Sequence, residues 1–207
     1  MVKVVAFDLW DTLIYLEKSW KTFTQLKPFI ARDENFWRQK VKPLYLFRQQ
    51  KSPESFLEDL RKSLGIDLRN LAPEMHKQLD YDLKHTKVYP DVFSTLEVCK
   101  KKGKKLAVMS NQCSFYVPSF YSLGLNKYFD FVLFSCNLGY GKPDERIYRK
   151  LIDITRTDPS NILIVGDHRN LDYQRPLELG FKAVHLSRNA ESSDSSIKTL
   201  DGIASKI

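Results

Sequence analysis

The sequence predicts an α/β fold in which a doubly wound parallel sheet is interrupted by a small helical domain. The chain begins with a continuous apolar, β-branched run at residues 2–7, which is typical of a strand buried on both faces. Comparable short runs recur in the second half of the chain and alternate with segments of helical periodicity. Strands that alternate with helices indicate parallel pairing, because each helical crossover returns the chain to the same end of the sheet.

Further strands are expected after the first, at Lys105–Met109, Phe131–Phe134, Ile162–Val165 and Ala183–Leu186. Apolar residues recur at helical spacing in the segments Asp91–Lys102, Asp144–Ile154 and Asn170–Leu179. Gly180 follows the last of these segments, and glycine commonly ends a helix at that position. The order of these elements predicts helices on both faces of the sheet.

Residues 15–86 break the alternation, because they contain helical patterns and no convincing buried strand. The expected helices are Leu16–Leu26, Asp33–Gln50, Pro53–Leu64 and Pro73–His85. Proline is favourable at the start of the last two, since the first turn of a helix does not need its N–H groups. We therefore predict that residues 1–14 and 87–207 form the α/β domain and that residues 15–86 form a helical insertion.

The composition is that of an ordinary globular protein, with 43% hydrophobic and 28% charged residues. No stretch approaches the roughly 20 apolar residues that a membrane span requires. The first residues also lack the pattern of a signal peptide, so we expect a cytoplasmic protein with no membrane partner. The cysteines, Cys99, Cys113 and Cys136, are odd in number and far apart, which favours reduced thiols over disulfides or a zinc site.

The net charge of +8 indicates an anionic partner, either a phosphorylated small molecule or a nucleic acid. The basic residues are scattered, and the chain has no arginine-rich tail or aromatic–basic motif of the kind found in nucleic-acid-binding proteins. A small anionic substrate is therefore the favoured partner and nucleic acid the disfavoured one. Nothing in the sequence indicates an oligomeric state.

Polar residues follow the predicted strands at their carboxyl ends. The first strand leads into Asp8-Leu9-Trp10-Asp11-Thr12, the second into Ser110-Asn111 and the fourth into Asp167-His168-Arg169-Asn170-Leu171-Asp172. A further loop with Lys142 opens a helix. Ligands of open parallel sheets bind beyond the carboxyl ends of the strands, so these side chains are expected to share one crevice.

These segments resemble the four motifs of the haloacid dehalogenase (HAD) superfamily, in the same order and at similar spacings. The resemblance covers the whole chain, because residues 15–86 fall where that family carries its helical cap. It implies a Rossmann-like HAD core and a hydrolase with Asp8 as its nucleophile. An attacking carboxylate would form a covalent intermediate and so divide one difficult displacement into two easier steps.

The residue types suit the binding of an anion. Ser110 and Lys142 are candidate catalytic residues, because a hydroxyl and an ammonium can hold the anionic oxygens of a substrate. Lys142 would also offset the repulsion among the neighbouring carboxylates, which would otherwise raise one of their pKa values. Thr12 and Asn111 are further candidates for substrate binding.

The same crevice is predicted to hold Mg²⁺. Asp8, Asp167 and the main-chain carbonyl of Trp10 would offer three hard oxygen ligands, with waters and substrate oxygens completing the shell. Asp172 is expected to support these ligands or to be an alternative ligand, and Asp11 is expected to be a supporting residue.

The sequence departs from the family at Trp10. Most phosphatases of the superfamily carry an aspartate there that acts as general acid and base, and the loss of such a group typically costs about 10²–10⁴ in rate. Asp11 occupies the next position, where the family usually has glycine. We expect Asp11 to be a turn or capping residue that replaces the acid only if the turn re-aims its side chain.

A bulky residue at that position resembles the 2-haloacid dehalogenase branch, which is metal-free. The segment Phe36–Lys40 also resembles that branch and makes Arg38 a candidate for binding the departing halide, and Tyr148 has a counterpart there as well. Asp167 favours the opposite conclusion, because dehalogenases carry serine in that place. Two buried carboxylates, Asp8 and Asp167, would be costly without a cation between them.

Three functions therefore remain open. The leading hypothesis is Mg²⁺-dependent hydrolysis of a small phosphorylated metabolite, the second is 2-haloacid dehalogenation, and the third is a catalytically weak phosphate-binding or partner-binding protein. The aromatic residues of the insertion are expected to form mostly its own core, with one or two lining the site: Tyr15, Trp20, Phe23, Phe36, Trp37, Tyr45 and Phe47.

Overall fold

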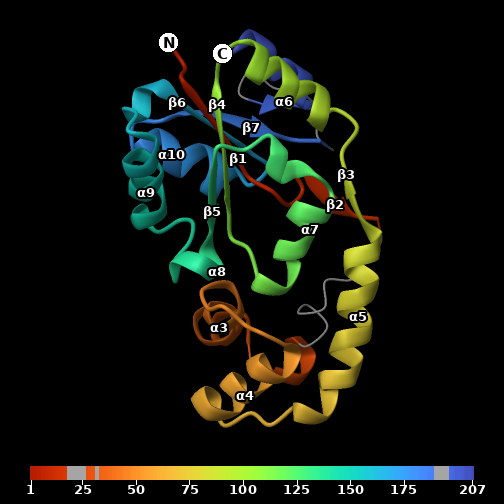
Figure 1. The fold of residues 1–207 in the computed structure, drawn as a ribbon. Helices are drawn as coiled ribbons and strands as arrows, with labels where there is room; N and C mark the ends of the chain where they lie inside the picture. The colour runs from red at the N-terminus through yellow and green to blue at the C-terminus, as the bar shows by residue number, and fades with distance from the viewer. Residues whose placement is uncertain (18–26, 31–32, 189–195) are drawn as a thin grey trace.

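The computed structural model describes residues 1–17, 27–30, 33–188 and 196–207. Its centre is a six-stranded sheet in the order β5-β4-β1-β6-β7-β8, and every pairing in it is parallel (Figure 1). The strands are β1 (Val4–Phe7), β4 (Lys105–Ser110), β5 (Phe131–Phe134), β6 (Ile162–Gly166), β7 (Lys182–Leu186) and β8 (Ser196–Ile197). The predicted fold class is confirmed, and only the short edge strand β8 was not expected.

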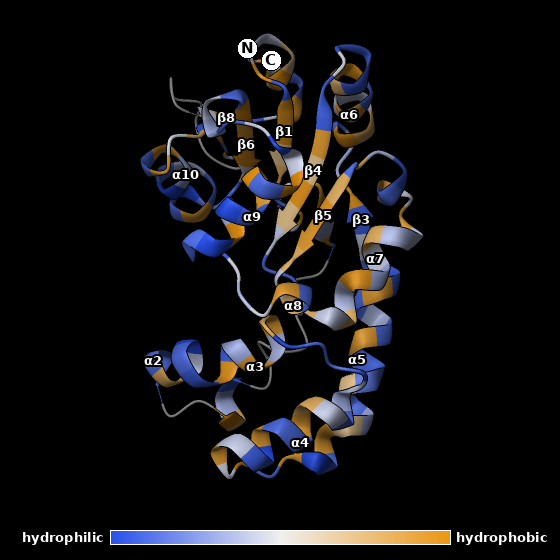
Figure 2. Ribbon diagram, turned by 60° about the vertical axis from the view of Figure 1, so that its left-hand side comes forward, coloured by the Kyte–Doolittle hydropathy of each residue, from blue (hydrophilic) through white to orange (hydrophobic). Residues whose placement is uncertain are grey.

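Alternate residues of β1 enter two separate cores, which is why the strand reads as an unbroken apolar run. Val5 and Phe7 belong to one hydrophobic cluster, whereas Val4 and Ala6 belong to the cluster on the opposite face of the sheet. All four side chains are almost completely buried. Figure 2 shows the matching hydrophobic colour along the central strands. A strand of this kind can occupy only the middle of a sheet that is covered on both sides.

Helices cover both faces. On the face of Val5 and Phe7, the cluster is completed by α6 (Val92–Lys101), α7 (Val117–Ser122) and the terminal 3₁₀-helix Leu200–Ser205. On the other face, α9 (Glu145–Thr155) supplies Ile147, Tyr148 and Leu151. The short helices α8 (Ser135–Leu138) and α10 (Arg175–Glu178) follow β5 and β6.

The helical part of the chain lies at one end of the molecule, beyond the strand end that carries α8 (Figure 1). An antiparallel pair, β2 (Ile14–Leu16) with β3 (Thr86–Val88), joins it to the sheet domain. The helices of the helical part are α2 (Glu34–Phe36), α3 (Lys42–Leu46), α4 (Pro53–Leu64) and α5 (Ala72–His85). These helices share a core of their own, separate from the two cores of the sheet, and Cys113 and Tyr116 of the sheet domain also contribute to it.

The helix boundaries differ from the predictions in three places. The expected helix Asn170–Leu179 is a π-helix at Arg169–Gln174 followed by α10. The expected helix Asp33–Gln50 is α2 and α3 joined by a π-helix at Trp37–Val41, and it ends at Leu46. The expected helix Leu16–Leu26 is wrong at its first residue, because Leu16 pairs with Thr86 in β2, and residues 18–26 lie outside the described residues. Short pairings such as β2–β3 depend on residues 70 positions apart, which a local pattern does not reveal.

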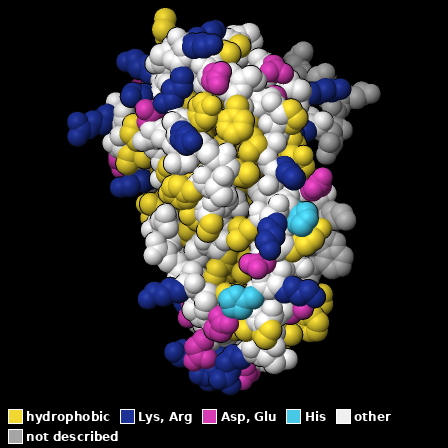
Figure 3. All heavy atoms as spheres, turned by 45° about the vertical axis from the view of Figure 1, so that its right-hand side comes forward, with side chains coloured by type: hydrophobic (Ala, Val, Ile, Leu, Met, Phe, Trp, Pro, Cys, Tyr) yellow, Lys and Arg dark blue, Asp and Glu magenta, His cyan; other side chains and the backbone are white. Residues whose placement is uncertain are grey.

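The surface carries charges of both signs. Figure 3 shows Lys and Arg side chains spread along the visible face and interleaved with acidic ones. All three cysteines are free and buried. Within the described part of the chain, no helix is long and apolar enough to cross a membrane.

Candidate functional site

Three neighbouring strands bring the predicted residues together at one edge of the sheet. Asp8 follows β1 and its backbone N–H donates to the carbonyl oxygen of Val165 in β6, at 2.9 Å. Asp167 follows β6, and Ser110 is the last residue of β4, the strand on the other side of β1. All three line one cavity of about 430 Å³, which therefore opens where the parallel strands end.

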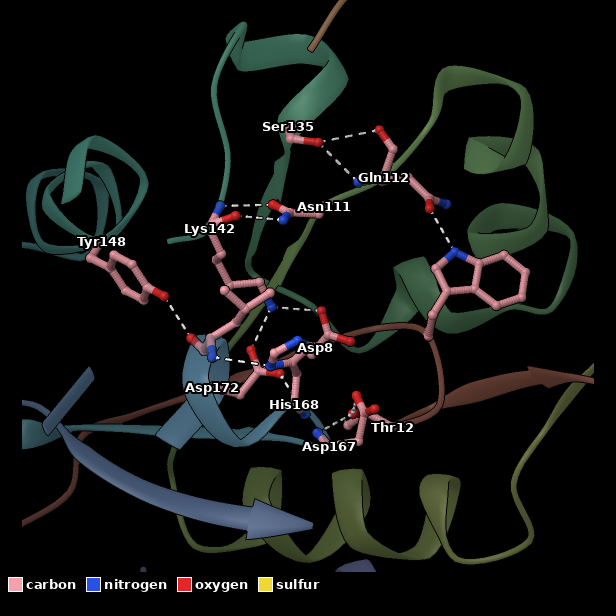
Figure 4. Close-up of polar contacts among 12 residues, drawn as sticks. Asp8, Thr12, Asn111, Gln112, Ser135, Lys142, Tyr148, Asp167, His168 and Asp172 are labelled. Carbon is pink, nitrogen blue, oxygen red and sulfur yellow. Dashed lines mark hydrogen bonds and ion pairs between the residues drawn. The ribbon is translucent and has the colours of Figure 1, made fainter. Parts of the chain in front are cut away.

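Lys142 is the centre of the charged network in this cavity. Its Nζ donates to Oδ1 of Asp8 at 2.7 Å and to Oδ1 of Asp172 at 2.5 Å (Figure 4). Lys142 is 4% exposed and Asp172 is 1% exposed, so the ion pairs are shielded from water. The second oxygen of Asp172 accepts from the backbone N–H of His168 at 3.1 Å. The lysine thus fixes both carboxylates from a single atom.

The position of Lys142 is itself set by Asn111. The side-chain nitrogen of Asn111 donates to the carbonyl oxygen of Lys142, and its side-chain oxygen accepts from the backbone N–H of Lys142, both at 2.7 Å. The amide of Asn111, expected to bind substrate, is therefore engaged with the backbone of the lysine, although the residue also lines the cavity.

Thr12 lies beneath Asp167 rather than at the cavity surface. It is fully buried, accepts from the backbone N–H of Asp167 at 3.2 Å and donates to its Oδ1 at 3.3 Å. Arg188 holds the same loop, because its guanidinium donates to the carbonyl oxygen of Thr12 at 2.7 Å and pairs with Asp91. The structure thus places Thr12 where it positions Asp167, and not among the residues that line the cavity.

Burial makes the carboxylates of this site costly to ionise. Desolvation raises the pKa of Asp8 to about 6, an effect that Lys142 opposes and Asp172 reinforces. Desolvation and the negative charges of Asp8, Asp172 and Asp11 raise the pKa of Asp167 to about 7. Burial alone would lower the pKa of Lys142, but Asp172 and Asp8 outweigh it and raise that pKa, so the lysine stays charged. One ammonium does not offset all the carboxylates, which leaves an excess of negative charge.

The donor set fits a divalent cation. One oxygen from each of Asp8, Asp167 and Asp172 can be chosen so that all three lie within 4.8 Å of one another. Ligands of one Mg²⁺, each at 2.0–2.1 Å, stand at most about 4.2 Å apart, so a small closure would bring these oxygens into its shell. Asp172 already accepts from Lys142 and His168, which leaves Asp8 and Asp167 as the better placed ligands.

Trp10 bridges the two cores of the molecule. Its ring packs against both the sheet cluster and the helical cluster, and its indole N–H donates to the side-chain oxygen of Gln112 at 2.6 Å. Asp11, the next residue, has a φ of 58°, a left-handed conformation that favours glycine. The backbone at Asp11 is therefore not extended, and the side chain lines the cavity together with Asp8 and Asp167.

Two residues suggested by the dehalogenase resemblance are not brought to the cavity. Arg38 has a side chain that is 69% exposed and that pairs with Glu34 on its own helix. Tyr148 is completely buried in the sheet core, where its hydroxyl donates to the carbonyl oxygen of Leu171. Neither residue is among those that line the cavity.

The helical part also lines the cavity, with residues that the motifs did not identify. These are Lys27, Trp37, Lys42 and Tyr45, and the sheet domain adds Gln112, Tyr116 and His168. Trp37 and Tyr45 are among the aromatic residues of which one or two were expected to line the site, whereas Trp20 and Phe23 lie outside the described residues. His168 could have been found from its place between Asp167 and Asp172.

The sequence matches the family described as haloacid dehalogenase-like hydrolase over residues 2–174. It is 38% identical over 104 residues to haloacid dehalogenase-like hydrolase domain-containing protein 3 of Mus musculus, a match that covers 50% of this chain and 41% of that protein. It is 37% identical over 111 residues to a phosphoglycolate phosphatase of Aquifex aeolicus, covering 52% of each. The match covers less than half of the length of haloacid dehalogenase-like hydrolase domain-containing protein 3.

Solved structures with the same fold include both kinds of chemistry. A HAD phosphatase from Thermococcus onnurineus has a TM-score of 0.67 at 23% identity, covering 99% of this chain and 97% of that one. A 2-haloacid dehalogenase from Pseudomonas syringae pv. Tomato DC3000 has a TM-score of 0.68 at 21% identity, with the same coverage. Identities this low show a shared fold, and the fold alone does not distinguish the two reactions.

Proposed function

The chain belongs to the haloacid dehalogenase-like hydrolases, and on that premise we propose that it is a Mg²⁺-dependent phosphatase of small phosphorylated metabolites. The observation that carries this proposal is the excess of carboxylate over ammonium at one cavity, with Asp167 as its most telling member. A divalent cation between Asp8 and Asp167 would offset the cost of ionising this second buried carboxylate. The relatives named as phosphoglycolate phosphatase support a phosphate ester as substrate.

In this proposal Asp8 attacks the phosphorus atom and the ester P–O bond breaks, so that an aspartyl-phosphate forms and the alcohol leaves with a proton from solvent water. Water then hydrolyses the aspartyl-phosphate, which releases phosphate and restores the Asp8 carboxylate. Lys142 holds the attacking carboxylate in place, and Ser110 donates its hydroxyl to a phosphoryl oxygen. Asp8, Asp167 and the carbonyl of Trp10 would hold Mg²⁺, and Asp172 and Asp11 would support them. When bound, Mg²⁺ supplies the positive charge that stabilises the transferring phosphoryl group.

We further propose that residues 15–86 form the cap over this site. Helical residues such as Trp37 and Tyr45 share the cavity with Asp8 and Asp167, which supports a role in excluding water and choosing the substrate. The antiparallel pair β2–β3 would be the hinge, since both chain connections between the two parts pass through it.

The test is phosphate release from a panel of phosphate esters, with Mg²⁺ and with EDTA. The proposal predicts release that requires Mg²⁺. Turnover that is equally fast in EDTA would exclude it.

Dehalogenation remains the second candidate, because Trp10 stands where phosphatases carry their acid. Chloride release from 2-chloropropionate is the measurement that would favour it. The exposed position of Arg38 weakens this candidate, since the residue expected to assist halide release is paired with Glu34 instead.

The close approach of Gly166 to Asp172 makes a specific prediction. A Cβ at Gly166 would lie 2.4 Å from Cγ of Asp172, so Gly166→Ala must displace the carboxylate that helps to hold Lys142. We expect kcat/KM to fall by about 10²-fold, because displacements near 1 Å have effects of that size. Gly202→Ala is the matched control, since its new methyl group would meet only Ile197 at 3.1 Å. Equal activity of the two variants would contradict the role given to Asp172.

A further inference from the structure

The cavity has two chemically different walls. One carries the carboxylates and Lys142 described above. The other carries four aromatic residues, Trp10, Trp37, Tyr45 and Tyr116, which we call the aromatic wall. Leu16 and Leu46 lie beside them on the same cavity. A phosphate group accounts for the carboxylates and lysines of the cavity, Lys27 and Lys42 included, and the aromatic wall is left to contact the organic part of the substrate.

Two members of the aromatic wall are held in place by polar contacts at their far ends. The indole N–H of Trp10, its only donor, is taken up by Gln112 at 2.6 Å. The hydroxyl of Tyr116 donates to Oδ2 of Asp82 at 2.6 Å, and Asp82 lies fully buried on α5. The rings of Trp10 and Tyr116 also meet edge to face, with centroids 5.5 Å apart. Their orientation is therefore set before any ligand arrives.

The other two members form a second aromatic pair. The rings of Trp37 and Tyr45 have centroids 5.9 Å apart, and Tyr45 packs in turn on Phe56 behind it. Trp37 and Tyr45 are 5% and 8% exposed, so each presents only a small part of its ring to the cavity. Such surfaces bind best to another ring, because aromatic pairs gain about 0.5–1.5 kcal/mol beyond the burial of area.

The size of the cavity agrees with a ring-bearing substrate. At about 430 Å³ it falls within the range of roughly 300–1,000 Å³ that is usual for sites of drug-sized ligands. A substrate with a two-carbon polar body would leave the small accessible parts of the rings of the aromatic wall without an apolar partner, whereas a ring on the substrate would cover them.

We propose that the physiological substrate is a phosphate ester whose organic part carries an aromatic ring, seated against Trp10, Trp37, Tyr45 and Tyr116. This inference rests on the proposed phosphatase function and narrows its substrate class. It assigns specificity to the aromatic wall and makes Asp82 a positioning residue that acts through Tyr116.

The test compares 2-phenylethyl phosphate with ethyl phosphate. Both are esters of primary alcohols, so their chemical reactivity is similar and the ring is the main difference. We expect kcat/KM to be about 10- to 100-fold higher for the phenyl ester, the gain that burial of one ring supports, and mainly through a lower KM. Equal values for the two esters would overturn the inference and leave the phosphatase function standing.

Variants locate the preference on the aromatic wall. Trp37→Leu is expected to reduce the ratio of the two kcat/KM values by at least about fivefold, since it removes a ring contact. Phe181→Leu is the matched control, because Phe181 is a buried aromatic residue that packs on Tyr148 in the sheet core and does not line the cavity. It should keep the wild-type ratio. If Trp37→Leu does not fold, Tyr45→Leu serves the same purpose. An unchanged ratio in the folded wall variant would contradict the assignment.

A binding measurement separates the failure of this inference from the failure of the proposed function. Quenching of tryptophan fluorescence reports binding of 2-phenylethylphosphonate and ethylphosphonate, neither of which can be hydrolysed. At least about tenfold tighter binding of the phenyl compound supports the aromatic wall even if no ester is turned over. Equal binding of the two compounds overturns the inference, whatever the enzyme does to phosphate esters.

Discussion

Lys142→Ala is expected to lower kcat/KM by about 10³-fold and to cost about 3–5 kcal/mol of unfolding free energy at neutral pH. The change removes the cation that donates to Asp8 at 2.7 Å and to Asp172 at 2.5 Å, and both carboxylates are shielded from water. The nucleophile would lose its orientation, and the two acids would either repel each other or take up a proton. Steady-state kinetics and denaturant unfolding in EDTA measure the two effects.

Lys104→Ala is the control for the effect of removing a buried lysine that lies outside the site. Lys104 is also buried, and its Nζ donates to the carbonyl oxygen of Val2 at 2.8 Å, at the other end of the sheet domain. This variant should lose about 1–2 kcal/mol, the contribution of a charged hydrogen bond, and keep its activity. If Lys142→Ala were as active as Lys104→Ala, the central position given to Lys142 would be wrong.

Asp167→Asn is expected to abolish stabilisation by Mg²⁺ and to lower kcat/KM by about 10²–10⁴-fold, while making the metal-free protein more stable. The amide keeps an acceptor for Thr12, which donates to Oδ1 of Asp167 at 3.3 Å, but it carries no charge. In excess Mg²⁺ the wild type should gain about 2.7 kcal/mol at 100 times the dissociation constant, whereas the variant should gain nothing. Thermal unfolding with Mg²⁺ and with EDTA measures both parts.

The stability that metal-free Asp167→Asn gains over the metal-free wild type should depend on pH. Because the pKa of Asp167 is raised to about 7 in the folded protein, the folded state binds a proton that the unfolded state releases near pH 4. The stability of the metal-free wild type therefore falls as the pH rises from about 4 to about 7. Asp167→Asn removes that loss, so the stability advantage of the variant should be absent near pH 4 and on the order of 4 kcal/mol at pH 8, because one pKa unit corresponds to about 1.4 kcal/mol. An advantage that is independent of pH, or Mg²⁺-dependent turnover in the variant, would contradict this account.

The fold was predictable because its main signals are local. The run at residues 2–7 is apolar throughout since β1 is buried on both faces, and α4 begins at Pro53 and ends at Leu64 as its capping residues indicate. The β2–β3 pair was not predictable, because each strand has only three residues and their pairing is set by the joining of the two parts of the chain.

The site was predictable where it depends on strand ends and not where it depends on the orientation of helices. Asp8, Ser110 and Asp167 meet because parallel strands end at one edge. Arg38 is the second residue of the π-helix Trp37–Val41, and its side chain turns outward to Glu34. A resemblance between segments does not reveal which side of a helix faces the cavity, and the same limit explains why Lys42 was not identified.

Chemical trapping at Asp8 tests the central claim most directly. The wild-type protein is mixed with Mg²⁺ and an excess of an intact phosphate ester that it hydrolyses, and the reaction is quenched in acid. The protein is then treated with borohydride, which reduces an acyl phosphate to an alcohol. The account predicts that peptide mass spectrometry finds Asp8 converted to homoserine, only when substrate and Mg²⁺ are both present, and that Asp8→Asn gives no reduced residue. Release of phosphate with Asp8 unmodified throughout, or with the reduced residue at another position, would contradict it.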